Sequence, residues 1–146
     1  MQVVQATEAL LDEVAQMFDA YRVFYGQDSD PARARLFVSD RMSRRESVIF
    51  VALAEGKGIG FIQLYPSFSS VSTVQIWILN DLYVKPEARR SGAGKALMQH
   101  AANWAREHGA ARLILETARD NAEAKALYAT LGWSLEDAYD RYELEL

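Results

Sequence analysis

The pattern of apolar and polar residues predicts a short strand and two helices at the start of the chain. Gln2–Gln5 is rich in β-branched residues, which favours a strand. Thr7 then fits an N-cap, and apolar residues recur at helical spacing until Gly26. These residues are Leu10, Leu11, Val14, Phe18, Tyr21 and Tyr25. Pro31 can begin a second helix, whose arginines we interpret as a solvent-exposed face.

Two strands joined by a tight turn are predicted next. Val48–Ala54 and Ile59–Tyr65 are apolar runs on either side of the sequence EGKG, a pattern typical of a β-hairpin. Pro66 predicts a bend, because proline restricts the backbone and removes an N–H donor. Residues 67–73 are polar and predict a connecting segment.

The next strand is the centre of the predicted sheet. Val74–Val84 is apolar almost throughout, as expected of a strand that is covered on both faces. The dipeptide Asn80-Asp81 interrupts it. Two polar residues inside a buried strand predict a bulge or splay, where backbone groups become free for a ligand.

The rest of the chain predicts two helices and three strands. A helix ends at Gly109, a strand follows at Arg112–Thr117, and a second helix begins after Asp120-Asn121 and ends at Gly132. Trp133–Leu135 and Tyr139–Leu146 are expected to form a final antiparallel pair. No linker or repeat divides the chain, so we predict one domain over residues 1–146, an α+β (mixed α/β) fold with mixed strand directions.

Composition narrows the classes of function. The net charge is −4, which argues against nucleic-acid or anionic-membrane partners. There is no cysteine, so thiol catalysis and thiolate metal sites are excluded, and we expect no metal. The first residues lack the features of a signal peptide, and no apolar run approaches the roughly 20 residues of a membrane helix. We therefore expect a soluble, cytoplasmic protein.

A basic, glycine-bearing loop separates the central strand from the helix that follows. The loop carries the pattern Arg89-x-x-Gly92-x-Gly94, with Arg90 and Lys95 as further cations. A Walker loop is excluded because no hydroxyl residue follows Lys95, and the match to a dinucleotide fingerprint is weak. Glycines and a helix N-terminus suit a pyrophosphate. An ordinary strand-to-helix turn remains the alternative on this loop alone.

At this point the sequence resembles the GNAT superfamily of N-acyltransferases. The stretch LYVKPEARRSGAGKALM is similar to its acetyl-CoA signature, and Asn121-x₆-Tyr128-x₃-Gly132-Trp133 to its second motif. The resemblance covers essentially the whole chain and implies a central, mostly antiparallel sheet with a splayed strand pair and helices on both faces. Within the superfamily the chain looks most similar to small polyamine or diamine acetyltransferases.

The resemblance implies an acetyl-CoA site and a mechanism. Its cofactor-binding residues would be Leu82, Tyr83, Val84, Arg89, Arg90, Ser91, Gly92, Ala93, Gly94, Lys95, Asn121 and Tyr128. Tyr128 matches the family's general acid, which protonates the leaving thiolate. The backbone N–H of Leu82 would stabilise the oxyanion. Tyr128 could instead be a packed aromatic residue, and Asn121 only a helix cap.

The general base departs from the family pattern. Similar polyamine enzymes carry a glutamate where this chain has Asn80, which cannot accept a proton. Asp81 is the nearest carboxylate, but strand alternation directs it to the other face of the sheet unless a bulge turns it. Proton removal through water, or binding of an already neutral amine, stays open. Aromatic residues of the first helix, Tyr21 and Tyr25, could bind a cationic amine together with Asn80 and Asp81.

These observations predict an acetyl-CoA-dependent N-acetyltransferase of the acyltransferase class. The acetyl group would pass directly to a primary amine, in a ternary complex, because the chain has no cysteine to form a thioester. The expected acceptor is a small polyamine, diamine or amino-acid-like amine. The alternatives are a protein lysine or N-terminal acetyltransferase and a non-catalytic CoA-binding module. Exposed aromatic residues near the C-terminus make a homodimer plausible.

Overall fold

The helices and strands of the first 116 residues follow the apolar pattern of the chain. The computed structural model describes residues 1–146, and these divide into two compact units, Met1–Glu116 and Thr117–Leu146. The first unit contains β1 (Gln2–Gln5), the 3₁₀ turn η1 (Glu8–Leu10), α1 (Leu11–Phe24), α2 (Pro31–Ser43), β2 (Val48–Ala54), β3 (Lys57–Ser69), β4 (Val74–Val84), the 3₁₀ turn η2 (Pro86–Ala88), α3 (Ala93–Glu107) and β5 (Leu113–Ile114). Organisation as one domain stays a prediction.

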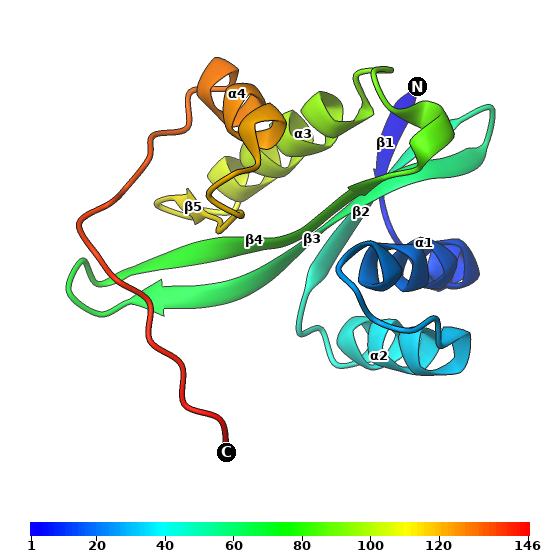
Figure 1. The fold of residues 1–146 in the computed structure, drawn as a ribbon, viewed down its shortest axis with the longest axis horizontal. Coiled ribbons are helices and arrows are strands. Elements are labelled where there is room, and N and C mark those ends of the chain that lie inside the picture. Colours follow the sequence, from blue (N-terminus) through cyan, green and yellow to red (C-terminus); the bar gives the residue numbers. More distant parts are fainter. The chain divides into compact units, whose positions relative to one another are not determined.

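The five strands form one sheet in the order β1-β2-β3-β4-β5 (Figure 1). Neighbours are antiparallel except for β4 and β5, which are parallel and pair only through Trp77–Leu113 and Ile78–Ile114. α1 packs on one face of this sheet with α2 against it, and α3 packs on the other face (Figure 1). The predicted mixed fold is confirmed. The ladder between β4 and β5 ends at Ile78, and β4 continues beyond it to Val84.

The core on the α1 face joins both helices to the sheet. Val14 from α1, Val38 from α2 and Phe61 from β3 are almost completely buried in one cluster. On the α3 face, Phe50 of β2 makes an edge contact with Trp104, whose ring is 5.7 Å away. Each large apolar side chain buried in this way contributes about 1.5–3 kcal/mol to folding. Both faces of the sheet are therefore covered by packed helices.

A bulge interrupts β4 at the predicted position. Gln63 of β3 pairs with Asp81, but the next residue, Leu64, pairs with Leu79, so Asn80 is an extra residue on β4. Asp81 therefore shares a face with Tyr83, whose side chain belongs to the core on the α1 face. The bulge resolves the alternation problem: it places Asp81 on the α1 face of the sheet.

The predicted bounds of two strands in the first unit are wrong: β3 begins at Lys57 and not at Ile59, and both β3 and β5 end elsewhere than expected. β3 does not bend at Pro66 but continues to Ser69. Pro66 is tolerated because its nitrogen points away from β4, towards β2, whose pairing with β3 has already ended at Leu64. β5 contains only Leu113–Ile114, not Arg112–Thr117, since its parallel ladder with β4 stops there.

The second unit contains α4 (Ala122–Thr130). The Asn121 side chain caps this helix as predicted, accepting a hydrogen bond from the Ala124 N–H at 3.2 Å. Within this unit, residues 133–146 contain no strand, so the predicted antiparallel pair is absent there. An isolated two-stranded ribbon is only marginally stable unless it joins a larger sheet or packs on an apolar surface. Within this unit the single short helix offers no sheet for such a ribbon to join. No helix in either unit is both long and apolar enough to cross a lipid bilayer.

Candidate functional site

The loop between β4 and α3 exposes several backbone donors. Gly92 is the N-cap of α3 and has a φ of +87°, a left-handed conformation that favours glycine. The Ala93 N–H is satisfied by the Ser91 hydroxyl oxygen at 3.3 Å. The N–H groups of Gly92, Gly94 and Lys95 have no acceptor in the chain. These free donors lie at the N-terminus of a 15-residue helix, where an anion is stabilised.

The cations of this loop are exposed, and Arg89 is held in place. Its Nε donates to the Val84 carbonyl oxygen at 3.2 Å, and its guanidinium lies 5.7 Å from the centre of the Phe24 ring. Arg90 has a φ of +65°, an uncommon conformation for a residue with a side chain. Lys95 belongs to the first turn of α3 and is exposed. The loop therefore presents positive charge beside its free amides.

The edge of β4 that follows the bulge also carries free backbone groups. The Lys85 N–H donates to the Ile59 carbonyl oxygen at 2.8 Å, which fixes the alternation of the ladder between β3 and β4. By this alternation Tyr83 faces β3, whereas Leu82 and Val84 direct their N–H groups away from it. On that side β5 pairs no further than Ile78. The Leu82 N–H is thus available to a ligand, as the predicted oxyanion donor must be.

Asp81 is the buried carboxyl of the site. Its exposed fraction is only 3%, and its Oδ2 accepts a hydrogen bond of 2.5 Å from the Gln63 side-chain amide. Gln63 is completely buried, and its Oε1 accepts from the Ser47 hydroxyl at 2.8 Å. Burial raises the pKa of Asp81 to about 6, although hydrogen bonds from Gln63 and Tyr21 oppose the rise. Asp81 can therefore accept a proton near neutral pH.

Two tyrosines surround this carboxyl. The Tyr21 hydroxyl lies 3.2 Å from the Asn80 carbonyl oxygen and also close enough to Asp81 to donate its one proton there instead. Burial, followed by the charge of Asp81, raises the pKa of Tyr21 well above its ordinary value. The same causes raise the pKa of Tyr65 to about 12. Both hydroxyls are therefore donors throughout the physiological range. Tyr25 is exposed and packs against Tyr21, with ring centres 5.0 Å apart.

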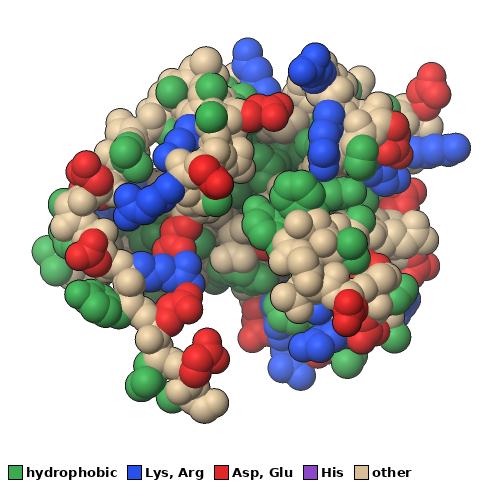
Figure 2. All heavy atoms as spheres, viewed as in Figure 1, with side chains coloured by type: hydrophobic (Ala, Val, Ile, Leu, Met, Phe, Trp, Pro, Cys, Tyr) green, Lys and Arg blue, Asp and Glu red, His purple; other side chains and the backbone are tan.

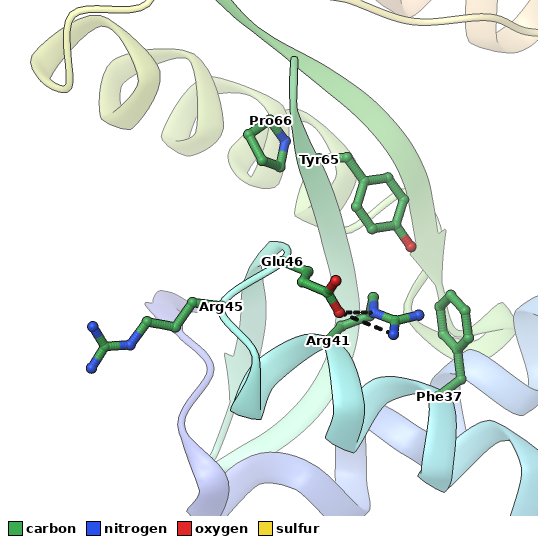
Figure 3. A pocket seen from close by; sticks show the side chains of 6 residues that line it. All are labelled: Phe37, Arg41, Arg45, Glu46, Tyr65 and Pro66. Carbon is green, nitrogen blue, oxygen red and sulfur yellow. Dashed lines mark hydrogen bonds and ion pairs between the residues drawn. The ribbon is translucent and has the colours of Figure 1, made fainter.

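An open cavity of about 750 Å³ lies beside Tyr65 on the same face of the sheet. Its lining residues are Phe37, Arg41, Arg45, Glu46, Tyr65 and Pro66 (Figure 3). They come from α2, from the segment after it and from β3. Figure 2 shows basic and acidic side chains side by side over the region of α1 and α2. The cavity is thus an open recess with both apolar and charged lining residues, and Tyr65 connects it to Asp81.

The second unit carries the other predicted site residues. Tyr128 lies in α4, where its ring centre is 6.1 Å from that of Trp133. Its carbonyl oxygen accepts from the Trp133 N–H at 3.0 Å. Besides capping α4, Asn121 contacts the Thr117 hydroxyl at 3.5 Å. The roles of Tyr128 and Asn121 with acetyl-CoA stay predictions.

Sequence reasoning missed four residues of this region: Ser47, Gln63, Tyr65 and Arg41. Gln63 had a signal, since it is the single polar residue inside the apolar run Ile59–Tyr65. Arg41 had none, because one arginine among several on a helix cannot be told from a solvated neighbour. The structure distinguishes it by its burial, with only 20% of the side chain exposed.

Comparison with known proteins points to one family. The Acetyltransferase (GNAT) family model matches residues 11–133. The uncharacterized N-acetyltransferase YhfO of Bacillus subtilis (strain 168) is 42% identical over 146 residues, which span 100% of this chain and 98% of that protein. A crystal structure of a probable acetyltransferase superposes with a TM-score of 0.94 at 44% identity, covering 100% of this chain and 98% of that one. Aminoglycoside N(6')-acetyltransferase type 1 of Klebsiella aerogenes is 28% identical over 100 residues, 67% of this chain and 66% of its own.

Proposed function

Because the chain belongs to the GNAT acetyltransferase family, and is therefore an acetyl-CoA-dependent N-acetyltransferase, we propose that its acceptor is the primary amine of a small molecule. The observation that carries the proposal is the buried carboxyl of Asp81, next to a recess of about 750 Å³. A recess of this size suits a metabolite-sized ligand. The similarity to an enzyme named for aminoglycosides, which are small molecules, supports the same class.

The donor half of the site fits the CoA pyrophosphate. The free N–H groups of Gly92, Gly94 and Lys95 would hold the phosphate oxygens, and Arg89 and Arg90 would add charge. Bound acetyl-CoA supplies the acetyl group as an activated thioester. The Val84 N–H would pair with the pantetheine arm as a strand neighbour does. We expect Ser91 and Ala93 to shape the turn, and Tyr83 to anchor the strand through its buried ring.

The acceptor half centres on Asp81. A primary amine reaches the site as an ammonium ion, and a carboxyl with a pKa of about 6 is ionised at neutral pH and can take its proton. The Leu82 N–H, one residue further on and directed to the open edge of β4, would stabilise negative charge on the acetyl oxygen. Tyr128 would return a proton to the departing sulfur, which a tyrosine can do because its ordinary pKa of about 10 exceeds the thiol's.

An amine panel tests this function directly. Purified protein is given acetyl-CoA and diamines, polyamines, amino sugars, amino acids and lysine peptides, and CoA release is measured with a thiol reagent. The chain contains no cysteine, so each thiol detected belongs to CoA. We expect turnover on small amines, a fall of about 10²–10⁴-fold in Asp81→Asn, and a comparable fall in Tyr128→Phe with acetyl-CoA binding retained. Turnover on peptides alone, or on nothing, contradicts the proposal.

A further inference from the structure

We propose that the acceptor carries a carboxylate as well as its amine, and that Arg41 binds this carboxylate in the recess beside Tyr65. The inference rests on the proposed function, because it presumes that the amine is acetylated at Asp81. It narrows the acceptor to amino-acid-like molecules and disfavours polyamines. Three features support it: the geometry of Arg41, the charges of the recess and the position of Tyr65.

Arg41 is a guanidinium with one edge occupied and one edge open. Its Nε and Nη2 both contact Glu46 Oε1, each at 3.1 Å (Figure 3). Its Cζ lies 4.5 Å from the centre of the Phe37 ring, which covers one side of the plane. A guanidinium has five N–H donors in a fixed fork. Glu46 uses the side edge only, and Nη1 has no partner in the chain. The end edge, Nη1 with Nη2, is a ready site for a second carboxylate.

The charges of the recess favour an anion. Its charged lining residues are Arg41, Arg45 and Glu46. The Glu46 carboxylate is already paired with Arg41, so an additional ammonium group of a polyamine would compete with Arg41 for it, whereas a carboxylate can use the open edge of Arg41. Only Arg41 directs its charge at the recess, since the Arg45 side chain extends away from the other five lining residues (Figure 3). Arg41 is also mostly shielded from solvent, so its contact with an anion is weakly screened.

Tyr65 connects the recess to the carboxyl that would take the proton. It lines the recess, and the charges of both residues act on its hydroxyl: Asp81 raises the pKa of this hydroxyl and Arg41 lowers it. A negative and a positive centre therefore both act on this one tyrosine. An acceptor that carries an ammonium and a carboxylate matches this pair of charges. Because its pKa is about 12, the Tyr65 hydroxyl stays protonated and can donate to the bound carboxylate.

The test uses amines that differ in a single charge. A series of α- to ω-amino acids of increasing length is compared with the corresponding carboxamides, and kcat/KM is measured by CoA release. In the longer members the carboxylate is too remote to alter the amine's own pKa. We expect each well-fitting acid to exceed its carboxamide by about 10-fold or more, the scale of one charged hydrogen bond.

Three variants assign the preference to Arg41. Arg41→Gln should remove the difference between acid and carboxamide by raising KM for the acid, with the KM for acetyl-CoA unchanged. Arg44→Gln, which removes an exposed arginine outside the recess, is the matched control and should keep the difference. Glu46→Gln removes the competing carboxylate while Arg41 stays, so it should increase the preference. This variant keeps the test decisive even if Arg41→Gln unfolds.

The outcomes separate this inference from the proposed function. If acids and carboxamides are acetylated equally, or Arg41→Gln keeps the preference, the inference is overturned while the acetyltransferase function stands. If no amine is acetylated, the proposed function fails. Titration calorimetry of the N-acetyl acids against the N-acetyl carboxamides then still decides the carboxylate site. Carboxylate-dependent binding that Arg41→Gln abolishes supports it, and its absence overturns it.

Discussion

The Gln63 side chain donates a hydrogen bond from its Nε2 to Asp81 Oδ2 across the β3–β4 ladder, at the bulge itself. Both residues are buried, and the Ser47 hydroxyl donates to the other end of the Gln63 amide. A buried amide that is held at both ends cannot turn round without losing both bonds. In the proposed reaction Gln63 is therefore a positioning residue: it holds Asp81 and presents a donor to its ionised form.

Removing this donor should move the pH dependence of the reaction. The bond from Gln63 lowers the pKa of Asp81, so Gln63→Leu should raise that pKa above about 6. Because Asp81 must be ionised to act, the rising acid limb of kcat/KM should shift to higher pH. Ser47→Ala, which releases the other end of the amide, should shift it in the same direction by less. Ser43→Ala, at an exposed hydroxyl near the end of α2, is the control. If the acid limb of kcat/KM stays at the same pH in Gln63→Leu, the hydrogen bond from Gln63 does not control the ionisation of Asp81.

Asp81 should also make stability depend on pH. Its folded pKa of about 6 lies above the ordinary value of 3.8, so the folded state binds more protons than the unfolded chain between these values. The stabilising contribution is complete below pH 3.8 and is lost as pH rises through about 6. The difference corresponds to about 3 kcal/mol at most. Urea unfolding of Asp81→Asn at pH 5 and pH 8 should show less of this loss than the parent protein. Identical pH profiles for both proteins would refute a raised pKa.

Gly60 should be intolerant of any side chain. A Cβ at this position would lie 2.7 Å from the Tyr83 carbonyl oxygen, a backbone atom that cannot move without breaking the β3–β4 ladder. Gly60→Ala should cost about 1–3 kcal/mol, as overpacking does, and should weaken acetyl-CoA binding by displacing Val84. Gly58→Ala is the matched comparison, because its shortest contact is to the flexible end of Glu13. Chemical denaturation should rank the two, and equal costs would contradict this account.

The loop before α3 should contribute measurably to acetyl-CoA affinity. Arg89→Ala removes one cation beside the free amides, and we expect the dissociation constant to rise about 10-fold, the scale of one charged hydrogen bond. Arg106→Ala, at the opposite end of α3, should leave it unchanged. Calorimetric titration with CoA gives both values. If affinity survives Arg89→Ala, the pyrophosphate lies elsewhere.

The order of elements as far as α4, and the loop that we propose as the donor half, could be predicted from the sequence because both depend on local patterns. Glycine, a helix N-terminus and basic residues occur together within residues 89–95. The bulge is indicated by the polar pair Asn80-Asp81 inside an apolar strand. The predicted strand boundaries were wrong where the end of a strand depends on its neighbouring strand. Pro66 lies inside β3 because β2 has already ended beside it, which no local pattern reveals.

The proposed acceptor half could be predicted only in part, because it is assembled from distant residues. Tyr21, Asn80 and Asp81 were expected to lie there, whereas Gln63, Tyr65 and Arg41 were not. Tyr21 reaches Asn80 across 59 positions of sequence, and Gln63 reaches Asp81 across 18. The face to which the Asp81 side chain points depends on one unpaired residue, Asn80. Strand alternation could not decide this face, because it did not reveal whether a bulge was present. Arg41 is distinguished from the other arginines of α2 by its Glu46 and Phe37 contacts, which appear only when the helix is packed.

The bulge has a consequence for insertions and deletions in β4. Without Asn80, Leu79 would still lie opposite Leu64 and Asp81 opposite Gln63, so both neighbours would keep their present partners. Shortening a central strand by one residue ordinarily turns every later side chain to the wrong face. Here we expect a chain lacking Asn80 to fold with an unbroken ladder and to lose the carbonyl oxygen that faces Tyr21. The sheet would be complete without this residue, and the acceptor site would not.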